Sequence, residues 1–332
     1  MILSVLDLSI VSGRDAQAQA LRDTLEAAKA AERLGYHRFW VSEHHNIPGV
    51  ASPGPEVLIA ALTQVTTTIR LGSGGVMLVN HSPLKVAEVF MALEALAPGR
   101  IDLGLGRALG TDPRTGAALR SAGSEAFPHY FALLCAWLLD AAGKEPIGPG
   151  HPLHDVHASP TGPSHPDVFL LCSSADSAIL AGQAGVGMIY SEFIAQREGG
   201  EAAAAYRKAF RPSPFRETPW TGIAVAAIAA PTVEAAKRLD APRRASQLAT
   251  AMGRQRRFPS VEEAEDFLAG FRNDPRLAAV ETRSIASDPA TVRARLAAKA
   301  AAAEADEVFI LATGPTLADR IRSLELIKAA DG

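Results

Sequence analysis

The sequence of 332 residues contains only two cysteines, Cys135 and Cys172, and both lie far apart in apolar stretches. They are therefore expected to be reduced and buried, as in a cytoplasmic protein, rather than joined in a disulfide. An excess of charge of one sign is also lacking, because 33 basic residues face 36 acidic ones, for a net charge of −3. This balance does not support nucleic acid or a membrane surface as a partner.

A long hydrophobic run is missing as well. The N-terminal stretch Met1–Leu8 has no basic segment before it and is too short to cross a bilayer, so we predict a first strand rather than a signal peptide. What the chain does have is a hydrophobic content of 48 %, which argues against disorder and suffices for a large core. We expect one domain over residues 1–332.

Short apolar runs alternate with amphipathic stretches along the chain. Eight runs have the length and flanks of buried strands, namely Leu3–Leu8, Arg38–Ser42, Ile69–Gly74, Ile101–Leu105, Val168–Cys172, Gly187–Tyr190, Ile223–Ile228 and Glu307–Leu311. Helices are predicted over Ala16–Leu34, Pro55–Thr67, Ser82–Ala97, Ser174–Ala184, Ala202–Phe210, from Asp288 onward and over Thr316–Ala330.

This alternation predicts an α/β protein with a closed (β/α)8 barrel, the TIM barrel, and an open doubly wound sheet is the alternative. Two segments interrupt the alternation, at about 107–166 after the fourth strand and 240–287 before the eighth. Insertions of this kind usually shape a substrate pocket or act as lids.

The triplet Glu43, His44 and His45 directly follows the second predicted strand. In a parallel α/β protein, chemistry is built at the carboxyl ends of the strands. Because neighbours along a strand point to opposite faces, Glu43 and His45 are expected on one side and His44 on the other. One histidine would act as general base or hydrogen-bond donor, oriented by Glu43. The alternative is a buried polar network that ties the strand to its loop.

Glycines surround the end of the third predicted strand. Gly74 and Gly75 permit a bulge or the close approach of a flat ligand, and the alternative is a tight barrel corner. The spacing is not that of a phosphate-binding loop or a dinucleotide fingerprint. In the following loop, Asn80 and His81 could line the same mouth, or His81 could simply cap the next helix.

Arg107 ends the fourth predicted strand, and Ser173, Ser174 and Ser177 surround the end of the fifth. Alone, the arginine could form a salt bridge and the serines could cap a helix. On adjacent strands they favour a phosphate clamp. No metal site is predicted, since the Pro/Gly-rich stretch with three regularly spaced histidines lacks carboxylate or thiolate companions, the three being His151, His154 and His157.

Taken together, these motifs resemble the luciferase-like flavin monooxygenases, the superfamily of bacterial luciferase, over nearly the whole chain. The resemblance is carried by Arg38–His45, Gly72–Leu78, His81–Pro83, Leu96–Arg107 and Ala318–Leu326. The stretch Gly106–Asp112 is similar to a subgroup often associated with polyketide tailoring.

The resemblance implies a barrel that binds reduced flavin mononucleotide (FMN), to which dioxygen adds to give a C4a-peroxyflavin that oxygenates a small organic substrate. His44 matches the family's catalytic histidine, and His45 is its neighbour. Gly74-Gly75 matches a bulge where many members place a non-proline cis peptide against the flavin. The 5′-phosphate site is matched by Arg107, Ser173, Ser174 and Ser177. A separate flavin reductase and a homodimer formed through the second and third helices are also implied.

The chain departs from its relatives at Gly106, which replaces a reactive cysteine of bacterial luciferase, at Leu109, which replaces a proline, and at Ser191–Phe193. Three other functions stay open. They are a deazaflavin-dependent dehydrogenase or reductase, a metal-dependent hydrolase that uses Glu43, His45 and His81, and a flavin-binding protein without catalysis.

Overall fold

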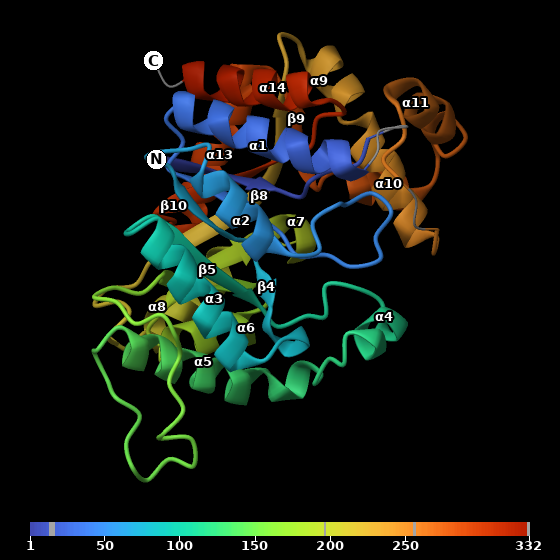
Figure 1. Ribbon diagram of the computed structural model, residues 1–332. Helices are drawn as coiled ribbons and strands as arrows, with labels where there is room; N and C mark the ends of the chain where they lie inside the picture. The colour runs from blue at the N-terminus through green and yellow to red at the C-terminus, as the bar shows by residue number, and fades with distance from the viewer. Residues whose placement is uncertain (13–16, 196, 255–256, 331–332) are drawn as a thin grey trace.

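The computed structural model of the protein describes residues 1–12, 17–195, 197–254 and 257–330. Parallel strands close into a barrel that helices surround (Figure 1). Strand β10 pairs with both β1 and β8, which joins the first and last strands of the barrel. The predicted (β/α)8 barrel is confirmed and the open sheet is excluded. Its strands are β1 (Ile2–Asp7), β2 (Arg38–Val41), β3 (Arg70–Ser73), β5 (Ile101–Gly106), β6 (Asp167–Cys172), β7 (Gly187–Ser191), β8 (Thr221–Ala229) and β10 (Glu307–Ala312).

The predicted helices all form, with small changes at their ends. They are α1 (Gln17–Arg33), α2 (Pro55–Thr63), α3 (Pro83–Leu96), α6 (Ala175–Gln183), α8 (Gly200–Ala209), α13 (Pro289–Ala303) and α14 (Leu317–Ala329). The predicted start of α1 at Ala16 lies outside the described residues. Helix α2 ends before the predicted Thr67, because the Glu32 carboxylate accepts hydrogen bonds from the backbone N–H groups of Thr67 and Thr68 and holds the chain out of the helix.

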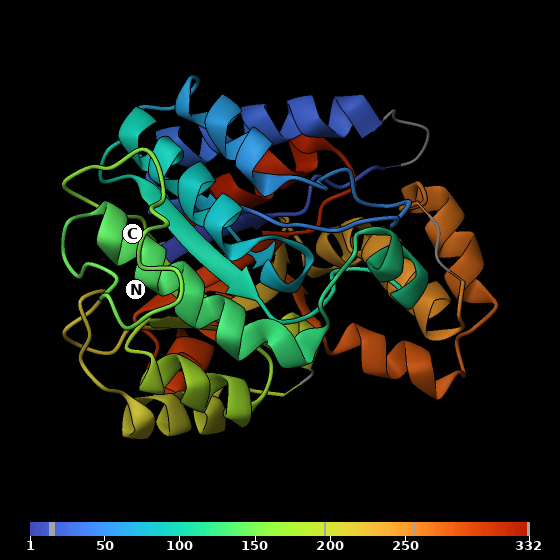
Figure 2. The ribbon, with the colours of Figure 1, turned by 60° about the horizontal axis from the view of Figure 1, so that its bottom comes forward.

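The structure also contains further elements. Of these, the sequence predicted only the helix that starts after the capping box of Ser260 and Glu263, and this helix forms. The insertion after β5 holds α4 (Pro113–Ala118) and α5 (Phe127–Ala141), and α5 packs against α3 as the regular fourth helix of the barrel. The extra segment is therefore shorter than predicted. Near the second insertion lie α7 (Glu192–Ala195), α9 (Val233–Leu239), α10 (Ala241–Ala251), α11 (Val261–Ala269) and α12 (Pro275–Glu281). Helices α10 and α11 stand to one side of the barrel in Figure 2.

Two short strands complete the sheet, β4 (Val76–Met77) beside β5 and β9 (Ser284–Ser287) beside β8. Ala226 and Ala227 of β8 pair with β10 and with β9 at the same time. A strand has two edges, so β9 must lie on the edge of β8 that β7 occupies lower down. The pairing of β7 with β8 ends at Ser191 opposite Ala224. Strand β9 therefore continues the barrel wall beyond the end of β7.

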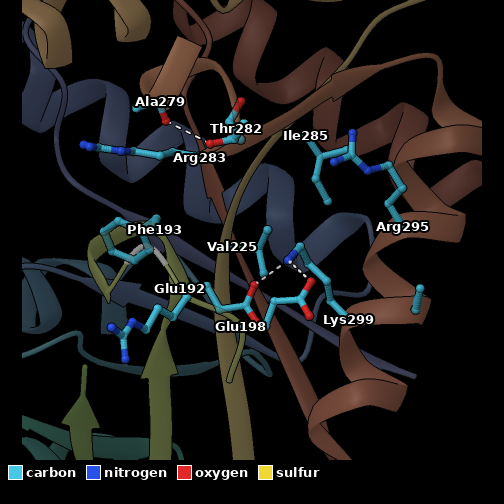
Figure 3. A pocket seen from close by; sticks show the side chains of 13 residues that line it. Glu192, Phe193, Glu198, Val225, Ala279, Thr282, Arg283, Ile285, Arg295 and Lys299 are labelled. Atoms are coloured by element: carbon cyan, nitrogen blue, oxygen red, sulfur yellow. Dashed lines mark hydrogen bonds and ion pairs between the residues drawn. The ribbon is translucent and has the colours of Figure 1, made fainter. Parts of the chain in front are cut away.

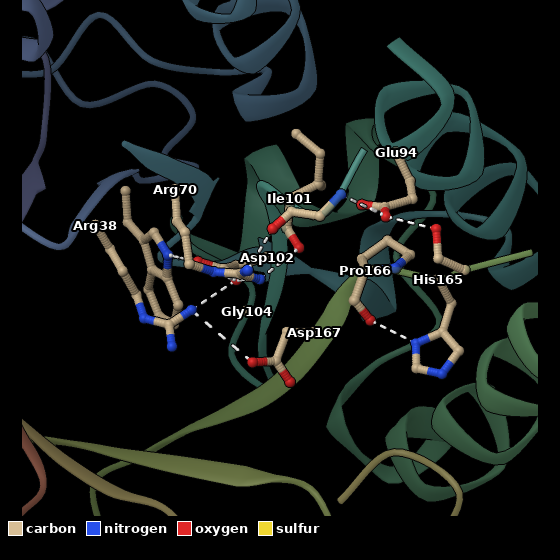
Figure 4. A network of polar contacts seen from close by, with 12 residues as sticks. Arg38, Arg70, Glu94, Ile101, Asp102, Gly104, His165, Pro166 and Asp167 are labelled. Atoms are coloured by element: carbon tan, nitrogen blue, oxygen red, sulfur yellow. Dashed lines mark hydrogen bonds and ion pairs between the residues drawn. The ribbon is translucent and has the colours of Figure 1, made fainter. Parts of the chain in front are cut away.

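A layer of buried charges crosses the amino-terminal end of the barrel (Figure 4). The Arg38 guanidinium lies 2.7 Å from Asp102 through Nη1 and 3.1 Å from Glu307 through Nε. Two indole N–H groups also donate hydrogen bonds to these carboxylates. Trp40 donates to Asp102 at 2.9 Å, and Trp220 donates to Glu307 at 3.1 Å. Burial alone would lower the pKa of Arg38, but Asp102 and Glu307 raise it well above its ordinary value. Arg38 is thus a permanent cation inside the barrel.

The Trp40 ring fills the barrel interior above this layer. Its ring centroid lies 4.4 Å from that of Phe309 and 5.2 Å from that of Phe169. A Cβ at Gly72 would lie 2.5 Å from the Trp40 Nε1 atom, so glycine is needed there for the indole to fit. This packing closes one end of the barrel and leaves the carboxyl ends of the strands for chemistry.

The remaining sequence expectations concern cysteines and membranes. Both thiols are free, and burial raises the pKa of Cys172 to about 12. No helix within the described ranges is long and apolar enough to cross a membrane.

Replacing Arg38 by methionine should strongly destabilise the fold, because it leaves the buried Glu307 carboxylate without its cation and leaves Asp102 with Arg70 alone. We expect a loss of about 3–5 kcal/mol in the free energy of unfolding, measured as a lower urea midpoint. Arg322→Met is the matched control, since Arg322 forms only a surface ion pair with Glu325, which is worth about 1 kcal/mol or less. Equal midpoints for the two variants would contradict the importance of the buried layer.

Candidate active site

The Glu43 carboxylate is the centre of a polar cluster just past the end of β2. Its Oε1 atom lies 2.8 Å from His45 Nε2 and 2.9 Å from His81 Nε2. Its Oε2 atom accepts the backbone N–H of Met77 at 2.9 Å. The side chain is fully buried. One carboxylate therefore joins the loop after β2 to strand β4 and to the loop that follows it.

The charges of this cluster support one another. Burial by itself would raise the pKa of Glu43, but the hydrogen bonds from His81, His45 and Met77 lower it below its ordinary value. The bond to Glu43 in turn raises the pKa of His81, against the opposing effect of burial. Glu43 is thus held as a carboxylate, and His81 is favoured as an imidazolium.

His44 points away from this cluster, as the alternation along an extended strand predicts. Its Nδ1 atom lies 3.1 Å from the Ser42 hydroxyl, and its backbone N–H donates to the Ser52 carbonyl at 2.9 Å. Burial lowers the pKa of His44, and the Glu43 charge offsets only part of this. The sequence predicted that Glu43 orients one of the two histidines, His44 or His45, and His45 forms this contact. The structure shows that Glu43 orients His45 and His81, while Ser42 holds His44.

His44 borders a cavity of about 360 Å³ beside the barrel mouth. The walls of this cavity are mostly apolar, from Ile47, Pro48, Val50, Ala51 and Pro53, with polar groups from Gln17, Asn46 and Arg257. A half-buried neutral imidazole at the edge of an apolar cavity is suited to accept or donate a proton near a small bound molecule.

The peptide bond between Gly74 and Gly75 is cis, as the resemblance implied. Packing within the barrel wall requires glycine at position 75 and leaves little space at Gly74. A Cβ at Gly75 would lie 2.7 Å from the Gly104 carbonyl oxygen, and a Cβ at Gly74 would lie 2.6 Å from Leu6 Cδ1. The glycines are therefore explained by the tight barrel corner, and contact with a cofactor stays a prediction.

The predicted phosphate residues follow two adjacent strands, because β5 pairs with β6 at Leu105 and Leu170. Arg107 is exposed just beyond β5, and Ser173 is exposed just beyond β6. Ser174 and Ser177 form a capping box at the start of α6, each side chain accepting the other's backbone N–H at 3.3 Å. The interpretation of these serines as a helix cap is thus confirmed. Arg107 and the N-terminus of α6 lie on the same rim of the barrel, because they follow adjacent parallel strands.

Other polar groups at the mouth were missed or left open by the sequence. For His81 the sequence left two possibilities open, lining the mouth or capping a helix, and the structure shows that its side chain binds Glu43. Thr111 donates to the His45 carbonyl at 2.7 Å, which fixes the loop after β5 over the cluster. A loop hydroxyl gives no sequence pattern that would have revealed this contact. In the part of the chain that the structure describes, no three metal-binding side chains are grouped to hold an ion.

Comparison with known proteins agrees with this architecture. The luciferase-like monooxygenase family matches residues 1–307, and the chain belongs to that family. An N-acetyl-S-alkylcysteine monooxygenase of Bacillus subtilis (strain 168) is 37 % identical over 80 % of this chain and 79 % of its own length. The structure of apo-MsnO8 is similar with a TM-score of 0.88 and 34 % identity, covering 99 % of this chain and 98 % of that one.

More distant structures share the fold alone. One is the oxygenating constituent of 3,6-diketocamphane monooxygenase from Pseudomonas putida, in complex with FMN, with a TM-score of 0.72 at 19 % identity over 99 % of this chain and 97 % of that one. Another is an F420-dependent secondary alcohol dehydrogenase, with a TM-score of 0.71 at 15 % identity over 99 % of this chain and 98 % of that one.

The pKa of His44 should lie below the ordinary histidine value of about 6.5, and the pKa of His81 should lie above it. His44 should lose its proton below that pH and His81 above it, read from histidine ring NMR signals assigned with His44→Gln and His81→Gln variants. Because the pKa of His81 is higher in the folded than in the unfolded protein, protonation of His81 stabilises the fold below about pH 6.5. This stabilisation is lost as the pH rises through the pKa of the folded protein. The melting temperature of wild type should therefore exceed that of His81→Gln most at acidic pH. A constant difference between pH 5 and 9 would contradict the Glu43–His81 ion pair.

Proposed function

We propose that this protein is a flavin-dependent monooxygenase that uses reduced FMN and dioxygen to oxygenate a small organic substrate. The observation that carries the proposal is the meeting of three features at one barrel mouth. They are the half-buried His44 after β2, the exposed Arg107 after β5, and the capped N-terminus of α6 after the adjacent strand β6. Membership of the luciferase-like monooxygenase family supports the same reaction class.

The residues at the mouth fit such a cofactor. The Arg107 guanidinium and the N-terminus of α6 supply a cation and oriented N–H groups, a donor set suited to a phosphate monoester. When bound, reduced flavin would activate dioxygen. His44, held by Ser42, would then donate or accept a proton at the reacting centre, and the apolar walls near it would exclude water and favour an apolar substrate.

Further parts of the proposal concern partners and context. A separate reductase would supply the reduced flavin, and two chains would pair through α2 and α3. Val57 on α2 and Leu96 on α3 support this pairing, with side chains 70 % and 65 % exposed. Most other apolar residues of these helices are buried against the barrel, such as Leu58, Val86 and Leu93. The similarity of Gly106–Asp112 to the polyketide-tailoring subgroup favours a role in natural-product biosynthesis in the cytoplasm.

Binding of the cofactor can be tested with and without its phosphate. Arg107→Gln should weaken the binding of reduced FMN by about 10- to 100-fold, the loss of one charge-assisted hydrogen bond, under anaerobic fluorescence titration. Reduced riboflavin, which carries no phosphate, should bind wild type and variant equally. An equal loss for both flavins would contradict a phosphate role for Arg107. Binding of coenzyme F420 in preference to either flavin would instead favour the deazaflavin-dependent dehydrogenase or reductase.

The role of His44 is tested by mixing the reduced complex with oxygenated buffer and following absorbance by stopped flow. In His44→Ala, the transient that follows oxygen addition should be shorter-lived than in wild type, and substrate oxygenation should fall by about 10²- to 10⁴-fold, as for a lost acid or base. His129→Ala, on the exposed face of α5, should behave as wild type. Identical traces for His44→Ala and wild type would remove His44 from the mechanism.

A further inference from the structure

A cavity of about 600 Å³ lies in the barrel wall where β7 gives way to β9. Figure 3 shows it between the chain that leaves β7, strand β8 and helix α13. Glu192 and Phe193 line it from the end of β7, Ser284 and Ile285 from the start of β9, and Val225 from β8. The cavity exists because β7 ends its pairing at Ser191 and β9 begins its own beyond that point.

This cavity is separate from the one at His44, because the two have no lining residue in common. Val225 belongs to the core between barrel and helices, whereas its neighbours Ala224 and Ala226 face the barrel interior. The cavity thus lies on the outer side of β8. Phe193 lines it and also packs against the cluster that fills the barrel interior. That ring therefore forms part of the boundary between the cavity and the barrel interior.

Basic side chains dominate the lining, with four against two acidic ones. Both acids are engaged by one lysine, since Lys299 Nζ lies 2.8 Å from Glu192 and 3.5 Å from Glu198 (Figure 3). Glu192 also accepts the backbone N–H of Gly199 at 2.9 Å, which fixes its position. The three arginines, Arg197, Arg283 and Arg295, have no carboxylate partner within the described parts of the chain.

Arg283 is the least exposed of these three arginines. Its Nε atom is buried and has no hydrogen-bond partner among the residues that the structure describes. Burial lowers the pKa of its guanidinium, and the nearby Arg243 lowers it further. A partly desolvated guanidinium without an acid gains from a bound anion, which would supply both charge and acceptors.

We propose that this cavity is a second binding site, which takes a small organic dianion with an apolar body. The excess of two basic side chains matches a double negative charge, as on a phosphate monoester or a dicarboxylate. Arginine forks bind either group through paired hydrogen bonds. Phe193, Val225 and Ile285 form the apolar part of the wall, against which a ring or short chain packs.

The test is calorimetric titration of the full chain, without flavin and at low ionic strength, where charge interactions are least screened. The probes are phenyl phosphate and phthalate, with phenol as the neutral control. Wild type should bind one equivalent of at least one dianion and no phenol. Tighter binding of phenyl phosphate would assign the site to phosphate esters, and tighter binding of phthalate would assign it to dicarboxylates. No binding of either dianion would overturn the proposal.

Substitutions then locate the bound probe. Arg283→Gln and Arg295→Gln should each weaken its binding at least tenfold. Arg295 is exposed on α13, so its variant removes a charge without disturbing the core. Arg272→Gln is the matched control, and it should bind the probe as wild type does. Arg272 is an exposed arginine of the insertion that also carries Arg283, and it does not line the cavity. Equal effects of all three variants would overturn the proposal, because they would indicate a general effect of charge.

Arg107→Gln separates this site from the predicted flavin-phosphate site. It should leave the binding of both dianions unchanged. Loss of binding in Arg107→Gln, with normal binding in Arg283→Gln and Arg295→Gln, would place the probe at the predicted flavin-phosphate site and overturn the proposal. Because the titration uses no flavin and no turnover, its outcome is independent of the proposed monooxygenase reaction.

Discussion

Arg38, buried between Asp102 and Glu307, is the contact on which the rest of the barrel depends. Arg38 lies on β2, and its guanidinium binds Asp102 on β5 and Glu307 on β10. Neither of these strands is hydrogen-bonded to β2, so the ion pairs connect strands that are not neighbours in the sheet. A buried charge without its partners is costly, and any register that separates them is disfavoured. The same carboxylates receive the indole N–H groups of Trp40 and Trp220, which fixes the rings that fill the interior.

Strand β2 therefore carries opposite functions at its two ends. At its start the charges are permanent and fully paired, because arginine stays protonated and the carboxylates are buried with it. At its end the buried Glu43 is paired with His45 and His81, and the hydrogen bond to Glu43 raises the pKa of His81. The first arrangement stabilises the fold, and the second holds groups that can exchange protons without loss of the barrel.

The wall of the barrel is interrupted at one place, and the second insertion explains how. Strand β7 is too short to cover the upper part of β8, and β9, which is contributed by the insertion, pairs there instead. The junction brings Glu192 of α7, directly after β7, and Lys299 of α13 into contact across the gap. The insertion, which the sequence predicted to shape a pocket or act as a lid, thus contributes β9 to the wall and lines a charged cavity on the outer side of β8.

The sequence by itself determined the strands and helices, because apolar runs and helix boundaries are local patterns that each element carries independently. The choice of a closed barrel over an open sheet was decided by the pairing of β10 with both β1 and β8. The sequence also placed Glu43 and His45 on one side and His44 on the other, since alternation along a strand is a local rule. Only the tertiary structure decided which groups meet. The Glu43–His81 contact and the Arg38 layer join distant segments through side-chain reach and strand order. The place of β9 in the sheet likewise depends on where β7 stops. Such contacts depend on distances between segments that have no fixed relation until the barrel closes.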